Sequence, residues 1–130
     1  MSVTVKNLDH VNLRTAALDA MVAWYGDVLG MRPGPRPGFS FPGAWLYAGD
    51  QAVIHLIGVE EPPSADPDAL RLEHFALSAE GMAAFIERLE ARGEQYRLNR
   101  IEDFGIVQVN LWDPDGNHIH VDFDAAEGAS

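Results

Sequence analysis

The chain has 130 residues, 47% of them hydrophobic, and a formal net charge of −11. This length suits one domain with its own core and is too short for two independent domains. Such an acidic surface repels phosphate backbones and anionic lipids, so neither nucleic acid nor a membrane is an expected partner. No apolar run approaches the roughly 18 residues of a membrane span, and no signal peptide is indicated. Without cysteines, a metal could be held only by nitrogen and oxygen, and a cytoplasmic location is expected.

The first half of the chain predicts a strand, a helix and three further strands. Apolar residues alternate in the first segment and then recur at helical spacing, and three prolines within 31–38 permit only a short edge strand there. The predicted elements are a strand at 7–14, a helix capped by Thr15 and ended by Gly30, the edge strand within 31–38, and a hairpin of 39–48 and 51–58. The apolar stripe of the helix is Leu18, Met21, Val22, Tyr25 and Leu29.

The second half repeats this order after an acidic, proline-rich linker at 59–70. Adding 64 to four residues of the first helical stripe gives the apolar stripe of a second helix, at Met82, Phe85, Ile86 and Leu89. The predicted elements are a strand at 71–77, a helix capped by Ser78 and ended by Gly93, strands at 95–100, 105–112 and 117–123, and a frayed tail at 124–130.

Two sequence patterns occur twice and place four of the five histidines. LDHVNL at 8–13 returns as LEHFAL at 72–77, which pairs His10 with His74, and the stretch 46–56 returns at 111–121, which pairs His55 with His120. Repetition at a fixed offset indicates two copies of one unit that bury their apolar faces together. We therefore predict one α+β domain over 1–130, in which two β-α-β-β-β modules (about 7–58 and 71–123) form a curved mixed sheet around a central metal and ligand cavity, with the helices on the outer face.

Strand alternation assigns the duplicated histidines to the sheet face away from the helices. On the first strand Val11 and Leu13 belong to the core, which leaves His10 on the other face. The same reasoning assigns Ala52, Ile54 and Leu56 to the core and His55 to the cavity. Polar and aromatic residues share the cavity face and predict a small-molecule site. The substrate-binding residues expected there are Asn12, Trp45, Tyr47, Gln108, Asn110 and Trp112.

Four histidines on one face predict a divalent metal. Neutral imidazoles bind zinc, nickel, iron, cobalt or manganese without needing thiolates, whereas packed imidazoles without a metal leave ring nitrogens unsatisfied and repel when protonated. The predicted ligands are His10, His55, His74 and His120. The alternative is a solvated cavity whose histidines bond only to water and neighbours. His118 is expected at the rim, with a position behind a ligand as the alternative, and Asp122 either orients a ligand histidine or is a structural ion-pair partner or exposed to solvent.

The sequence resembles the vicinal oxygen chelate superfamily, which includes glyoxalase I, extradiol dioxygenases and bleomycin-resistance proteins. The resemblance covers about residues 8 to 123 and is carried by LDHVNL, WYGDVLGMR, VIHL, LEHFAL and DPDGNHIHVDF. It implies paired modules around a divalent metal, with ligands at the positions of His10, His55, His74 and His120. Proteins of this family usually form homodimers, and the site is built within one chain or shared across a dimer.

The sequence departs from the family at the two later ligand positions. The family usually has glutamate where His120 stands, and glyoxalase I has glutamate or glutamine where His55 stands. The resemblance therefore implies a metal-dependent enzyme, most like a glyoxalase-type lyase or isomerase that chelates adjacent oxygens of a small substrate. His55 and His120 are its predicted catalytic residues, because a histidine displaced from the metal can act as a base near neutral pH. The alternatives are a dioxygenase, a bleomycin-resistance-type binding protein without catalysis, and a relic that serves as a subunit or sensor.

Overall fold

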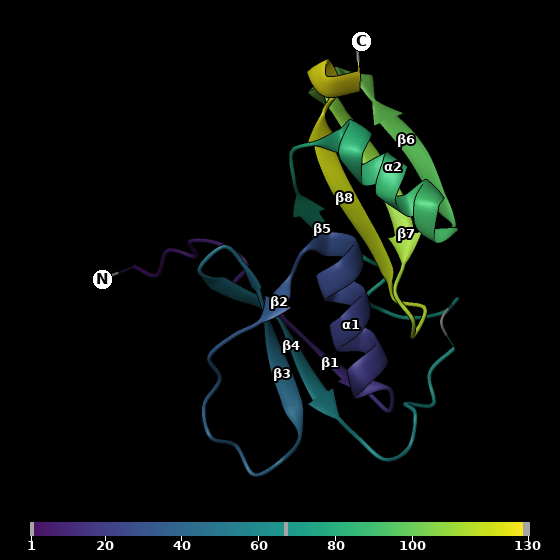
Figure 1. Ribbon diagram of the computed structural model, residues 1–130. Coiled ribbons are helices and arrows are strands. Elements are labelled where there is room, and N and C mark those ends of the chain that lie inside the picture. The colour runs from purple at the N-terminus through teal and green to yellow at the C-terminus, as the bar shows by residue number, and fades with distance from the viewer. Residues whose placement is uncertain (1, 67, 129–130) are drawn as a thin grey trace. The chain divides into compact units, whose positions relative to one another are not determined.

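The computed structural model describes residues 2–66 and 68–128, and its contacts divide between Pro63 and Ser64 into two compact units. We call them module one and module two. Each contains one four-stranded sheet and one helix (Figure 1). The predicted α+β class and the two β-α-β-β-β modules are confirmed. No helix in the described part of the chain is long and apolar enough to cross a membrane.

The two modules share one topology. In each sheet the first strand lies parallel to the last, and the other pairs are antiparallel. Module one contains β1 (Val11–Thr15), α1 (Leu18–Leu29), β2 (Arg32–Pro33), β3 (Gly43–Ala48) and β4 (Gln51–Gly58), with strand order β1-β4-β3-β2. Module two contains β5 (Phe75–Ser78), α2 (Met82–Arg92), β6 (Tyr96–Ile101), a 3₁₀ turn (Glu102–Phe104), β7 (Ile106–Trp112), β8 (His118–Asp124) and a second 3₁₀ turn (Ala125–Gly128), with order β5-β8-β7-β6.

The register of the strands repeats together with the sequence. The equivalent partners are Val11 with Ile54 and Phe75 with Ile119 in the parallel pairs, and Trp45 with His55 and Asn110 with His120 in the antiparallel pairs. Because a slip of one residue would turn every side chain to the other face, equal register means that equivalent residues share equivalent faces. The repeat seen in the sequence is therefore a repeat in the structure.

Each module has an apolar core between its helix and its sheet. The buried apolar side chains of module one are Met21, Trp24, Tyr25, Val28, Met31, Leu46, Ile54 and Leu56. Those of module two are Phe75, Met82, Phe85, Leu89, Val107, Val109, Leu111, Ile119, Val121 and Phe123. Most of these were predicted from alternation and helical spacing. On α1, however, Trp24 and Val28 are buried although they lie outside the predicted stripe, and Leu18 and Leu29 are only half-buried.

The first strand of each module begins later than predicted. β1 starts at Val11 and β5 at Phe75, so His10 and His74 precede the strands instead of lying inside them. Both are edge strands with one neighbour, and each lasts only as long as its parallel pairing with β4 or β8.

The predicted helix caps at Thr15 and Ser78 are wrong. Each is the last residue of a strand, and the helices begin after Ala17 and Gly81. Thr15 is fully buried, and its hydroxyl accepts a hydrogen bond from the backbone N–H of Ala17 at 2.9 Å. The threonine therefore stabilises the turn into α1 and does not cap its first turn.

The tail is ordered through Gly128, which contradicts the predicted fraying, while Ala129 and Ser130 lie outside the described residues, as do Met1 and Pro67. Glu127 explains the order. Its carboxylate accepts hydrogen bonds from the backbone N–H groups of Gly81 and Met82, at 2.8 and 2.9 Å. These N–H groups lie at the N-terminus of α2, where a negative charge is favourable.

Replacing Glu127 with alanine is therefore expected to lower the free energy of unfolding by about 1 kcal/mol, the typical value of an N-terminal cap. Urea denaturation of both proteins measures the difference. Glu87→Ala removes an exposed carboxylate from α2 and serves as the control. Equal stability of the two variants would contradict the capping role.

Candidate functional site

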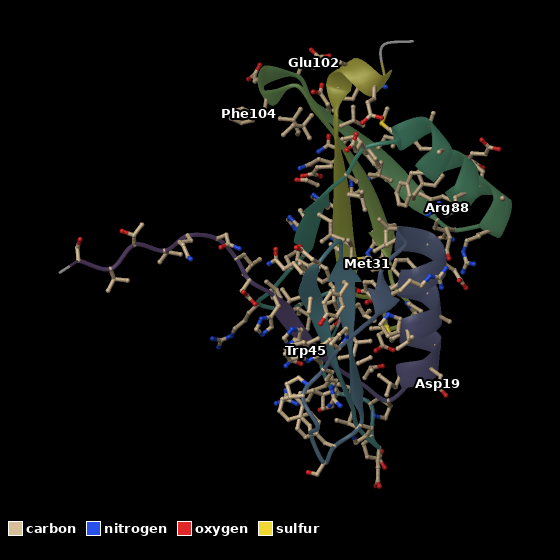
Figure 2. All side chains as sticks on the ribbon, turned by 60° about the vertical axis from the view of Figure 1, so that its left-hand side comes forward. Asp19, Met31, Trp45, Arg88, Glu102 and Phe104 are labelled. Carbon is tan, nitrogen blue, oxygen red and sulfur yellow. The ribbon has the colours of Figure 1, made fainter. Side chains whose placement is uncertain are left out.

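In module one, His10 and His55 stack on each other beside an aromatic wall. Their ring centroids lie 3.7 Å apart with an interplanar angle of 12°, and Trp45 of β3 (Figure 2) stacks on His55 at 3.9 Å. His55 is buried, with 8% of its surface exposed, whereas the side chain of His10 is 38% exposed. The structure thus brings together two predicted ligands and one predicted substrate-binding residue.

Hydrogen bonds fix which nitrogen each of these rings leaves available. His10 Nδ1 lies 2.7 Å from Asp9 Oδ1, and His55 Nε2 donates to the backbone carbonyl of Ala52 at 3.1 Å. The neighbouring strand β3 has a bulge between Leu46 and Tyr47, so that Tyr47 pairs with Ala52. Ala52 was predicted in the core, but the bulge breaks strict alternation and leaves it half-exposed. His10 therefore offers Nε2, and His55 offers Nδ1.

Module two contains a cluster of three histidines. His74 and His120 stack with centroids 4.0 Å apart and an interplanar angle of 12°, and His118 meets His120 at 4.9 Å in an edge arrangement. Each of the three has one ring nitrogen within 4.8 Å of the others. His120 is buried at 8% exposure, while the His74 side chain is 39% exposed and that of His118 is 15% exposed.

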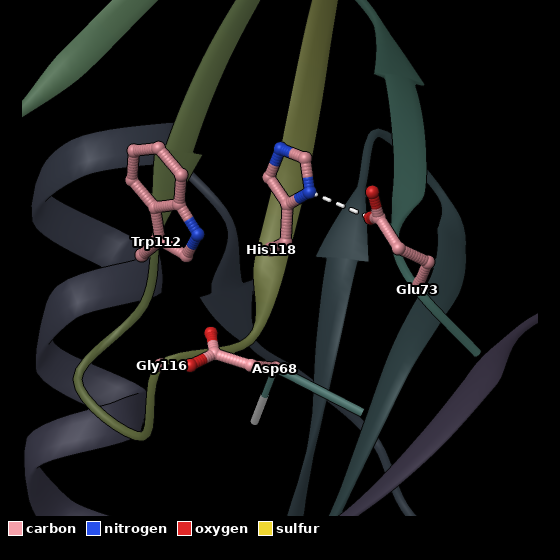
Figure 3. A pocket seen from close by; sticks show the side chains of 5 residues that line it. All are labelled: Asp68, Glu73, Trp112, Gly116 and His118. Carbon is pink, nitrogen blue, oxygen red and sulfur yellow. Dashed lines mark hydrogen bonds and ion pairs between the residues drawn. The ribbon is translucent and has the colours of Figure 1, made fainter. Parts of the chain in front are cut away.

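His118 is held by hydrogen bonds at both ring nitrogens. Nδ1 lies 2.7 Å from Glu73 Oε2 (dashed in Figure 3), and Nε2 lies 2.9 Å from Asn110 Oδ1. Asn110 donates through Nδ2 to the carbonyl of Arg97 at 3.1 Å, which fixes the orientation of its amide. Both ring nitrogens of His118 are therefore engaged with side-chain oxygens, so in this arrangement neither is left free for a metal.

Burial and hydrogen bonding set the charge of the site. Burial is the main reason why the pKa of His55 and that of His120 fall below the ordinary value of 6.5, with the neighbouring histidines adding to the effect. The hydrogen bond from His118 is the largest cause that lowers the pKa of Glu73. Burial raises the pKa of the Asp122 carboxyl. At neutral pH the site thus combines the neutral imidazoles of His55 and His120 with an ionised Glu73.

The lowered pKa values predict that the metal-free protein loses stability in acid. His55 and His120 stay neutral in the folded state at a pH where the unfolded chain binds protons, so their contribution is complete above pH 6.5 and is lost as the pH falls below it. NMR titration of the two rings should give pKa values under 6.5. Urea denaturation should show lower stability at about pH 5.5 than at about pH 7.5. Ring pKa values at or above 6.5 would contradict the prediction.

The remaining histidine nitrogens suit a divalent metal. Among the described residues, no hydrogen-bond partner reaches the buried Nδ1 of His120. Imidazole nitrogens bind zinc at about 2.0–2.1 Å, so two donors on one ion lie at most about 4.2 Å apart. A spacing within 4.8 Å needs only small ring rotations to reach that limit. His74 and His120 thus fit as ligands in module two.

The predicted substrate-binding residues differ in how far their polar groups are already used. Tyr47 donates its hydroxyl to the Pro35 carbonyl at 2.5 Å, and Gln108 Oε1 accepts from Asn99 at 3.2 Å. Asn110 is 2% exposed and holds His118. Asn12 is exposed, and Trp112 is 37% exposed while stacking on His118 with centroids 5.2 Å apart. Asn12 is therefore the most accessible of the set in module one, and Trp112 the most accessible in module two.

A pocket of about 320 Å³ opens beside His118 of module two. Its lining residues are Asp68, Glu73, Trp112, Gly116 and His118 (Figure 3). It combines an aromatic face with two carboxylates and the polar edge of His118. These features suit a small polar ligand beside the histidine cluster.

The turn in DPDGN determines where β8 starts. Asp113 accepts hydrogen bonds from the backbone N–H groups of Asp115 and Asn117, at 3.0 and 2.9 Å, and from the Asn117 side chain at 2.9 Å. Gly116 adopts a positive φ of 86°, which favours glycine. The turn fixes the first residue of β8 at His118 and so places His120 one step further on the same face.

Sequence reasoning missed the two acidic residues that contact the histidines. Asp9 contacts His10, and Glu73 contacts both His74 and His118. The signal was present, because an acid precedes the first histidine of both repeats. His118, which was expected at the rim or behind a ligand, lines the pocket and contacts Glu73 and Asn110.

Two comparisons of the sequence identify relatives. The family model described as the Glyoxalase/Bleomycin resistance protein/Dioxygenase superfamily matches residues 7–121. The Arabidopsis thaliana protein named Glyoxylase I 4 is 32% identical over 121 residues, which span 88% of this chain and 69% of that protein. The matched region includes all five histidines.

Solved structures show the same fold. A putative glyoxalase family protein from Bacillus anthracis is similar with a TM-score of 0.76 at 24% identity, covering 95% of this chain and 99% of that one. A lactoylglutathione lyase from Agrobacterium tumefaciens is similar with a TM-score of 0.65 at 26% identity, covering 92% and 94%. Together with the family match and the duplicated histidine-bearing modules, these similarities show that the chain belongs to the glyoxalase/bleomycin resistance protein/dioxygenase superfamily.

Proposed function

We propose that the protein is a metal-dependent enzyme, a glyoxalase-type lyase or isomerase that binds a small substrate through two adjacent oxygens. The observation that carries this proposal is a pair of stacked histidines in each module, at equivalent positions of the repeat. Folding alone does not explain histidine at these positions, because the apolar core of each module is made by other residues. Membership of the superfamily supports the same function.

We propose His10, His55, His74 and His120 as the ligands of a divalent ion, zinc, nickel, iron, cobalt or manganese. A bound ion of this kind would polarise a substrate oxygen and stabilise developing negative charge. Four neutral imidazoles leave its positive charge undiminished, unlike a set that includes glutamate. We also propose a homodimer in the cytoplasm, and light scattering would show twice the mass of one chain.

The chain's own residues supply proton transfer and orientation. We propose His55 and His120 as the catalytic residues, because their pKa values lie below 6.5 and a neutral imidazole can accept a proton. At His120 the accepting atom would be Nδ1, which is buried and has no partner among the described residues, when the ring is displaced from the ion. Trp45 and Trp112 offer flat apolar walls, and Asn12 an exposed amide, for holding the substrate.

The first substrate to test is lactoylglutathione, because one structural relative is named a lactoylglutathione lyase. Its hydroxyl and thioester oxygens are adjacent and suit binding to one ion. Chelator-treated protein should be inactive. Its activity should recover when one of the five metals is added. The proposal fails if the purified protein holds no transition metal and gains neither metal nor activity after addition.

A binding protein of the bleomycin-resistance kind is the second candidate. The observation that favours it is the pocket of about 320 Å³, in which Trp112 lies with the carboxylates of Asp68 and Glu73. A cationic aromatic ligand would stack on the indole and pair with the acids. Calorimetry with bleomycin separates the candidates, because tight binding to metal-free protein without turnover supports the binding function and contradicts the enzyme.

A further inference from the structure

An acidic residue contacts the first histidine of both modules. Asp9 Oδ1 lies 2.7 Å from His10 Nδ1, and Glu73 Oε2 lies 3.0 Å from His74 Nδ1. The two histidine side chains are nearly equally exposed, at 38% and 39%. The contact is therefore repeated with the module, although one acid is aspartate and the other glutamate.

We propose that Asp9 and Glu73 are positioning residues that keep the hydrogen of His10 and His74 on Nδ1 and leave the lone pair of Nε2 for a metal. A neutral imidazole has one N–H donor and one acceptor nitrogen, and an ionised carboxylate can only accept. Each carboxylate therefore selects the Nδ1–H form. The inference deepens the proposed function, since it names the atoms of His10 and His74 that would bind the ion.

The other two proposed ligands use different means to fix their rings. His55 donates through Nε2 to the Ala52 carbonyl and so offers Nδ1, the opposite nitrogen from His10. His120 is held by burial and stacking, and no partner in the described residues reaches its Nδ1. The acids therefore matter most for the two histidines that precede their strands, because those rings are more exposed than His55 and His120 and have only stacking besides the acid to orient them.

Glu73 contacts two histidines, whereas the contact of Asp9 is with His10. The same oxygen that accepts from His74 also lies 2.7 Å from His118 Nδ1, whose other nitrogen meets Asn110. Removing Glu73 frees two rings beside His120. We therefore expect a larger effect from Glu73→Ala than from Asp9→Ala.

If the two acids had a purely structural role, losing either one would lower the free energy of unfolding. Asp9 is 80% exposed and Glu73 68% exposed, and exposed ion pairs stabilise proteins little. Losing either acid should therefore leave urea stability nearly unchanged. Its effect should appear instead in the tautomer of the histidine and in its affinity for metal.

The test measures tautomers in the metal-free protein by ¹⁵N NMR of the histidine rings. Wild-type His10 and His74 should be in the Nδ1–H form, and each should shift toward Nε2–H when its own acid becomes alanine. Glu87→Ala, on the exposed face of α2, should change neither ring. Wild-type rings already in the Nε2–H form, or rings unaffected by Asp9→Ala and Glu73→Ala, would overturn the inference.

Zinc titration gives the second readout and needs no substrate. Each alanine variant should bind zinc roughly 10–100-fold more weakly, the usual effect of removing a group that orients a ligand histidine. Glu73→Gln keeps an accepting oxygen without the charge and should recover part of the affinity. Unchanged zinc affinity in both alanine variants contradicts the inference while leaving the proposed function standing. If the wild type binds no metal, the proposed function fails, and the NMR result still decides the tautomers.

Discussion

His120→Ala is expected to abolish metal binding and activity together. His120 is the proposed ligand with a buried nitrogen that has no hydrogen-bond partner among the described residues, and its neutral form is favoured by burial. Losing a ligand should weaken binding more than the roughly 10–100-fold effect of losing an orienting partner. Elemental analysis of the purified variant and zinc titration of the metal-free protein measure the loss.

His118→Ala is the matched control, because it removes another histidine from the same face of β8. Both nitrogens of His118 already bond to Glu73 and Asn110, so this variant should retain metal. Full metal content in His120→Ala would remove His120 from the ligand set. Loss of metal in His118→Ala equal to that in His120→Ala would show that His118 is a ligand, as the spacing of the three rings in module two permits.

Leu46→Ala and Leu111→Ala are each expected to lower the free energy of unfolding by about 2–5 kcal/mol. The two leucines occupy equivalent positions of the repeat on β3 and β7, at 0% and 1% exposure. Truncation removes apolar contacts and leaves a cavity in each core, and the well-packed neighbours can fill it only in part. Urea or thermal denaturation measures both losses.

Comparison of these two variants also tests the prediction of one domain. If the chain unfolds as one cooperative unit, either variant shifts a single unfolding transition. If the modules unfold independently, there are two transitions, and each variant shifts only the transition of its own module. Leu98→Ala is the control, since Leu98 is 41% exposed on β6 and should change stability by no more than about 0.5 kcal/mol. A loss near zero in Leu46→Ala or Leu111→Ala would contradict the assigned core.

The sequence by itself determined the repeated fold and the candidate residues. The offset between His10 and His74 and the alternation of Ile54 with His55 were enough to predict two modules and the face of each strand. These signals are local or periodic, and the strand ladders reproduce them with equal register. The family resemblance rested on the same segments and agrees with the match over residues 7–121.

Only the tertiary structure decided which atoms meet. The His55 ring contacts the Ala52 carbonyl, and β3 has a bulge between Leu46 and Tyr47, neither of which gives a periodic signal in the sequence. Glu127 caps α2 through Gly81 and Met82, which lie 46 and 45 positions before it in the sequence. Glu73 and His118, which are in contact, are also separated by 45 positions. Such contacts depend on the paths of several elements at once. For that reason, the sequence identified the histidines, whereas the fold determined which of their nitrogens remain available.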